Sequence, residues 1–166
     1  MANITQGLDP TRVDTVAQHP LGMVADDPRA GLFSGNKIKY VKAVASGVTL
    51  GVAVQLDITA TAADRRFSVK PTAATDLGSI VHGIAHVAIP NGSFGWITVE
   101  GVAFNVVVPD ALAVGNPMNG GAAGALVDAT AGSTETAALA TYLAAGKPVL
   151  LIEDTGTSLG TVWIGG

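Results

Sequence analysis

The fold is decided by the stretch NGSFGWITVEGVAFNVVVPD, residues 91–110. Gly92 places a turn at its start, and the side chains that follow alternate with the two-residue period of a β-strand. Gly101 allows a bulge or a bend. We predict a β-hairpin in which Trp96 and Phe104 are the bulky anchors and Val102, Phe104, Val106 and Val108 share one face. The stretch carries no obvious chemical group.

Shorter strand patterns surround this stretch. They cover residues 37–45, 48–57, 67–71, 79–88 and 125–128, and residues 148–153 and 160–165 read as a closing hairpin. One helix is predicted at 133–145, because Ser133 can cap its start and Gly146 can end it. About eight short strands with one small helix predict a mainly β domain, either a small β-barrel or a sandwich.

The first 36 residues differ from the rest. Pro10, Pro20 and Pro28 interrupt any long helix there, while apolar residues are scattered along the segment. We therefore predict two parts, an extended N-terminal arm at 1–36 and a β-rich domain at 37–166. An arm with this many apolar side chains is expected to lie along its own domain or along a neighbour.

Composition limits the partners. The chain is 48% hydrophobic but only 13% charged, against about 25% charged in an average soluble domain. No apolar run reaches the roughly 18–20 residues that span a membrane, and no secretory signal is visible at the start. Such a composition predicts that much of the surface is buried against copies of the chain or against another protein.

Charge and cysteine content exclude further classes. The net charge is −4, and the largest basic group is Lys37, Lys39 and Lys42, so nucleic-acid binding is not expected. The absence of Cys excludes disulfides and thiolate metal sites. We therefore expect neither nucleic acid nor a membrane as partner.

Candidate chemical groups are sparse. His82 and His86 would share a strand face about 13 Å apart, too far for one metal ion. His19 has no acidic neighbour in the sequence, and the acidic pairs Asp26–Asp27 and Glu153–Asp154 are typical of solvated turns. The glycine-rich residues 120–124 lack the Lys-Ser/Thr of a phosphate loop. We predict no catalytic residue, cofactor or metal, and hence a protein that is not an enzyme.

The tryptophans leave two readings open. Trp96 and Trp163 could form a platform on which sugars stack, or they could pack in the core or in an interface. With aromatics at only 5% of the chain, and with both Trp on predicted strands, packing is the favoured reading. Whether Trp96 faces its own core or a neighbour stays open.

The segment GSIVHGIAHVAIPNGSFGWITVEGVAFNVVV and the later ALAVGNPM carry a resemblance. The Gly-x-Ala strand at 83–85, the glycine turn before Trp96, the bend at Gly101 and the turn at 113–117 recur in the same order in one family. Over residues 37–166 the chain resembles the head decoration, or capsid cement, proteins of tailed bacteriophages.

This resemblance implies a β-barrel or β-tulip-like unit, often trimeric, on the outside of the virion capsid, assembled in the host cytoplasm. The implied partner is the major capsid protein, whose neighbouring subunits the unit would clamp. By analogy, the arm with its QHPLG sequence at 18–22 would contact the shell. The interface residues predicted on this basis are His19, Leu21, Met23, Leu32, Phe33 and Trp96. The alternative is a receptor- or glycan-binding β-domain of a head fibre or tail component.

Overall fold

The computed structural model describes residues 8–29, 35–61, 64–73, 81–109, 113–129, 149–154 and 158–165. Nearly all of its regular structure is β-strand, and the one helical element there is the short 3-10 turn η1, Ala122–Gly124. The strands are β1 (Val24–Asp26), β2 (Lys37–Ala43), β3 (Ala53–Leu56), β4 (Ser68–Pro71), β5 (Gly83–Ala85), β6 (Phe94–Val107), β7 (Met118–Gly120), β8 (Leu126–Asp128), β9 (Val149–Asp154) and β10 (Leu159–Ile164). The mainly β prediction is confirmed, and the helix predicted at 133–145 lies outside the described residues.

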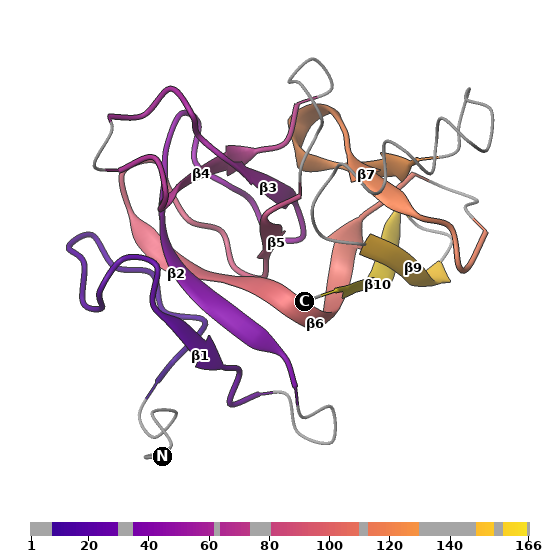
Figure 1. Cartoon of the computed structure of the whole chain (residues 1–166), viewed down its shortest axis with the longest axis horizontal. Coiled ribbons are helices and arrows are strands. Elements are labelled where there is room, and N and C mark those ends of the chain that lie inside the picture. The colour runs from indigo at the N-terminus through magenta and orange to yellow at the C-terminus, as the bar shows by residue number, and fades with distance from the viewer. Residues whose placement is uncertain are drawn as a thin grey trace.

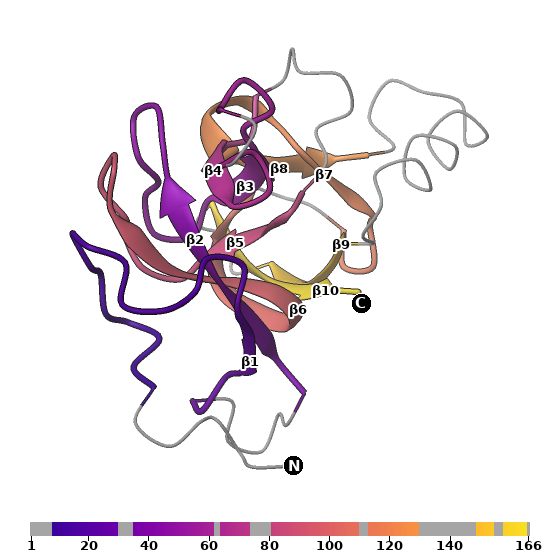
Figure 2. The same cartoon turned by 60° about the vertical axis from the view of Figure 1, so that its left-hand side comes forward.

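Five strands form a closed barrel (Figures 1 and 2). Their order is β2-β4-β3-β5-β6, and β6 closes the ring by pairing with β2 as well as with β5. The β2–β4 pair is parallel, and the other four pairs are antiparallel. Closure removes the exposed edges that an open sheet of these strands would have.

The remaining strands extend this barrel. The antiparallel pair β9–β10 forms the predicted closing hairpin and joins the second half of β6. On the other side of the barrel, β1 adds to β2. The strands β7 and β8 pair with each other in a separate small sheet, so the strand predicted at 125–128 is also confirmed.

The hairpin predicted for residues 91–110 is wrong. The structure has one continuous strand of 14 residues there, β6. Gly101 has a φ of 97°, and it bends the strand without reversing it. Residues on its N-terminal side pair with β2 and β5, and residues on its C-terminal side pair with β10. Because of this bend, one continuous strand belongs to the barrel in its first half and to the β9–β10 sheet in its second half.

The predicted common face of Phe104, Val106 and Val108 is also wrong. Val106 and Val108 are buried, whereas Phe104 is 54% exposed. Asn105 between them has a φ of 54°, and the β6–β10 register shifts here, from Val106 opposite Gly160 to Ala103 opposite Val162. A bulge adds one residue to one strand and so inverts the alternation beyond it.

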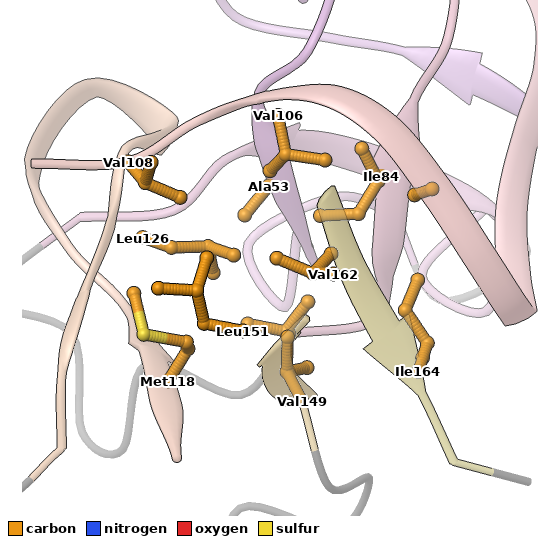
Figure 3. Packing of buried hydrophobic residues seen from close by; sticks show 12 residues of the cluster. Ala53, Ile84, Val106, Val108, Met118, Leu126, Val149, Leu151, Val162 and Ile164 are labelled. Carbon is orange, nitrogen blue, oxygen red and sulfur yellow. The ribbon is translucent and has the colours of Figure 1, made fainter. Parts of the chain in front are cut away.

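Buried side chains form three clusters. The first joins β6 to β7, β8, β9 and β10 (Figure 3) and contains Leu126, Leu151 and Ile164. The second draws on all five barrel strands, including Val41, Val54, Val69, Ala85 and Ile97, and fills the barrel. The third lies on the opposite side of β2 and β6 from the barrel filling, beneath the arm, because Tyr40 alternates with Val41 and Trp96 with Ile97.

The described part of the arm lies along its own domain, one of the two placements expected. Through β1 it pairs with β2, and Asp14 bridges Phe94 by two backbone hydrogen bonds of 2.9 and 2.8 Å. Leu8, Leu21 and Met23 pack against the third cluster. The division into an arm at 1–36 and a domain at 37–166 stays a prediction, but residues 8–29 are packed as part of the domain's outer wall.

Candidate functional site

A pocket of about 360 Å³ lies beside the bend in β6. Its walls come from the end of the arm at Asp27 and Arg29, from Leu50, from His86 after β5, and from β6 on both sides of Gly101. Pockets of this size that combine apolar walls with a few convergent polar groups are the usual place to look for an active site.

The acidic and basic groups of this pocket bind each other. Arg29 donates from Nε to Asp27 Oδ1 at 3.0 Å and from an Nη to Oδ2 at 2.9 Å, and its backbone N–H also reaches Oδ1. Burial alone would raise the pKa of Asp27, but these hydrogen bonds from Arg29 outweigh it and hold the pKa below its usual value. The pair is local to the end of the arm, because its two members lie two residues apart.

His86 ties the arm to the barrel. Its Nε2 lies 2.8 Å from the carbonyl oxygen of Pro10, and its Nδ1 lies 3.2 Å from the hydroxyl of Thr98. Because a carbonyl oxygen only accepts, Nε2 carries the proton and the neutral ring accepts from Thr98 through Nδ1. Burial, and then the nearby Arg29, lower the pKa of His86, which favours this neutral form.

Thr98 and His86 are the nearest approach to a nucleophile and base in this pocket. Thr98 is almost fully buried, and the ring of His86 is oriented by a backbone carbonyl instead of a carboxylate. A catalytic pair needs an accessible nucleophile and an oriented, basic partner. The geometry is that of a structural contact, in which His86 joins Pro10 of the arm to Thr98 of β6.

Asn36 completes the pocket wall by holding the bend of β6. Its side-chain amide donates to the carbonyl oxygen of Val102 and accepts from the Val102 N–H, both at 2.8 Å. A Cβ on Gly101 would lie 2.0 Å from Asn36 Oδ1. The Asn36 side chain therefore pairs with the Val102 backbone as a neighbouring strand would. It can come this close only because residue 101 has no Cβ.

His82 does not join His86. Its Nε2 lies 3.0 Å from the ammonium nitrogen of Lys39, whereas His86 bonds Pro10 and Thr98. Among the described residues, no group of three or more His, Cys, Asp or Glu side chains is placed to hold a metal ion.

No helix in the described part of the chain is long and apolar enough to cross a membrane.

Four of the six residues predicted to contact a partner lie in the described part of the chain, and all four surround one cluster. Trp96 is 1% exposed, and its ring lies 5.2 Å from that of His19 and 5.1 Å from that of Tyr40. Leu21 and Met23 are partly buried against the same cluster. Leu32 and Phe33 lie outside the described residues. The open question about Trp96 is answered, because it faces its own domain beneath the arm.

Tyr40 carries the polar contacts of the third cluster, which we call the arm cluster and define by Ala25, Ile38, Tyr40 and Trp96. Its hydroxyl donates to Asp14 Oδ2 at 2.7 Å. Burial and this hydrogen bond raise the pKa of Tyr40 to about 12. The other Asp14 oxygen accepts from Arg12 Nε at 2.7 Å. These contacts fasten the arm, so His19, Leu21, Met23 and Trp96 are brought together as packing against the barrel wall.

The acidic pairs also have different surroundings. Asp26 forms an ion pair with Lys37 on the neighbouring strand β2, while Asp27 belongs to the pocket. Glu153 accepts a 3.3 Å hydrogen bond from Thr161 across the β9–β10 pair. The glycine-rich residues 120–124 span the end of β7 and the η1 turn, and Thr72 donates to the carbonyl oxygen of Gly121.

Sequence reasoning missed an exposed apolar face on the β6–β10–β9 sheet. Trp163 on β10 stands directly opposite Val102 on β6 and Leu150 on β9, and it is 39% exposed. Phe104 and Ile152 are exposed beside it. The signal lay in the alternation of residues 162–164, but the bulges in β6 and β9–β10 that move Phe104 and Ile152 leave no mark in the sequence.

Comparison with known proteins identifies no relative. No family description, no characterised protein and no solved structure matches the chain.

Proposed function

We propose that this protein is a structural virion component that binds the outer surface of a phage capsid and stabilises contacts between major capsid subunits. The observation that carries the proposal is the exposed apolar face of the β6–β10–β9 sheet, with Trp163 opposite Val102 and Leu150. Exposed apolar faces of this kind mark protein interaction sites. The resemblance to decoration proteins supplies the identity of the partner.

The pocket supports the same proposal by its chemistry. Asp27, Arg29, Asn36, His86 and Thr98 all line it, and each has a hydrogen-bonding partner within the domain. A site for substrate needs polar groups left to bind the ligand. Asp27 and Arg29 instead bind each other, His86 ties the arm to the barrel and Asn36 holds the bend, which suits a protein whose role is to resist mechanical load.

A capsid clamp gains strength from repetition. Many copies on one particle act together, so each contact can be modest. We include in the proposal that the chain forms a homo-oligomer, a trimer by analogy with the decoration proteins it resembles, and that it acts on the virion exterior after assembly in the host cytoplasm.

The test uses heads purified without this protein. Adding the full chain should give saturable binding and raise the temperature at which the heads release their DNA. Binding no greater than that of an unrelated acidic β-protein would refute the proposal. Deleting residues 1–36 is a poor test, because it removes β1 and uncovers Trp96 and Tyr40.

One observation favours a second candidate, a receptor- or glycan-binding domain. Trp163 is exposed on a sheet face, where an indole can stack on a sugar ring. A glycan array would decide it: reproducible binding that Trp163→Ala abolishes would favour this candidate, and an array without binding above background would remove it.

A further inference from the structure

We infer that the outward face of the β6–β10–β9 sheet docks onto a protein surface that is apolar at its centre and carries Lys or Arg at its rim. This inference rests on the proposed function and names the part of the molecule that would meet the shell. We call this surface the docking face and define it by Val102, Phe104, Leu150, Ile152, Trp163 and Glu153.

The strand register places these side chains together. Trp163 is paired with Val102 on one side and with Leu150 on the other, and directly paired residues share one face of a sheet. Between Thr161 and Val162 the β9–β10 register shifts, so Ile152 is the extra residue of a bulge. It is 43% exposed. Bulges commonly re-aim a side chain at sheet edges and binding sites.

The opposite face of the same strands already has its partners. Val162, Ile164, Val149 and Leu151 point into the first cluster with Met118 and Leu126 (Figure 3). The docking face is therefore not needed to fill that core. Large apolar side chains exposed together on such a face gain their stabilisation from burial against something else.

Charge indicates what that partner carries. All eight Lys and Arg side chains that the structure describes lie between Arg12 and Lys70. Described residues from 113 onward hold Asp128, Glu153 and Asp154 and no Lys or Arg. Glu153 pairs with Thr161 across the strands and is exposed, on the same face as Trp163 by alternation. Glu153 is the one charged residue of the docking face as defined, and Arg29, which lines the pocket beside Val102 and Phe104, is paired with Asp27. An exposed carboxylate on the face favours a cation opposite it on the partner.

The same charges disfavour other occupants. Two copies meeting through their docking faces would bring the Glu153 side chains into one interface, and none of the described residues of the face supplies a compensating cation. Anionic lipid surfaces and nucleic acids attract basic segments, and this face has the opposite sign. A second copy could instead meet the docking face with its barrel side, where the described Lys and Arg lie. The experiment distinguishes this self-association from binding to another protein.

The experiment measures binding of the full chain to purified heads that lack it, at two salt concentrations. Trp163→Ser should weaken binding at least tenfold, and Ile152→Ser several-fold. Glu153→Lys should weaken it at least tenfold at low salt and reduce the salt dependence. The matched control is Ile58→Ser, an apolar residue that is 76% exposed outside the docking face and should change binding less than twofold.

The outcomes are distinguishable. Wild-type binding with unchanged Trp163→Ser and Glu153→Lys variants would overturn the docking face and leave the proposed function standing. No wild-type binding would overturn both. Light scattering completes the test: the Trp163→Ser protein should keep the wild-type mass, and a multimer that this substitution dissociates would show that the face pairs copies, contradicting the inference.

Discussion

The two halves of β6 have similar apolar sequences but opposite roles. From Phe94 to Glu100 the strand lies in the barrel, with one face in the barrel filling and the other beneath the arm, so Trp96 and Ile97 are both buried. Beyond Gly101 one face packs against the first cluster, while Phe104 on the other face is exposed. The chain covered one half of the strand with its own arm and left the other half open.

This comparison separates stability from recognition. Side chains on the covered half should matter for folding, and those on the open half for binding.

The largest effect is expected at the two tryptophans. Trp96→Ala removes a fully buried ring from the arm cluster and should lower the free energy of unfolding by about 3–5 kcal/mol, measured by urea denaturation. Trp163→Ala, on the open side, should cost about 1 kcal/mol or less. Equal losses in the two variants would contradict the division between the halves.

The bend between the halves should be the next most sensitive point. In Gly101→Ala the new methyl group meets Asn36 at a φ of 97°, and the backbone strain alone costs about 1–3 kcal/mol. Gly92→Ala is the control, with a φ of 80° but open space around it. If the unfolding midpoints of both variants fall equally, the Asn36 contact adds nothing and the account of the bend is wrong.

A smaller loss is expected from the hydroxyl beneath the arm. Tyr40→Phe leaves the buried Asp14 oxygen without its 2.7 Å donor and should cost about 1–3 kcal/mol. Amide hydrogen exchange locates the effect: protection should fall at Asp14 and Phe94, whose backbones bridge arm and barrel, and stay unchanged in β9 and β10. A uniform loss of protection would argue against a separately fastened arm.

The smallest effect concerns pH. The pKa of His86 in the folded protein lies below the ordinary value of 6.5. At a pH between this lowered pKa and 6.5, the unfolded chain binds a proton at His86 that the folded chain does not. Stability should therefore fall as the pH drops from about 7 through the lowered pKa, and level off below it. The charged groups that face the ring are Arg29 and Asp27.

The control for pH is His86→Gln, which keeps a donor for Pro10 but does not titrate. Its urea midpoint should vary less between pH 7 and pH 5 than that of the wild type. Identical pH dependence in both proteins would show that His86 is not the group responsible.

The strands and the class of fold could be predicted because period-two patterns depend on local sequence. The β9–β10 hairpin and β8 match predicted strands, whereas only Ala53–Leu56 of the strand predicted at 48–57 forms β3. The continuity of β6 could not be predicted, because a positive-φ glycine serves equally for a turn or a bend, and here the distant Asn36 decides between them. The face of Phe104 could not be predicted either, because it depends on the bulge at Asn105.

The candidate site shows the same limit. Trp96, predicted to contact a partner, is buried beneath the arm, and His19, Leu21 and Met23 pack partly exposed around the same cluster. Partner contact by these three residues stays a prediction. Nothing in the sequence distinguishes a side chain that packs on its own barrel from one that waits for a partner. That distinction required the register that places Trp163 between Val102 and Leu150.

The most direct test of the proposed function and docking face is an electron-microscopy map of phage heads mixed with the purified protein. The account predicts density for the domain on the outer surface of the shell, with the β6–β10–β9 face and Trp163 against capsid subunits and basic side chains near Glu153. A particle with no such density on its exterior, or with Trp163 turned to solvent while another face meets the shell, would contradict it.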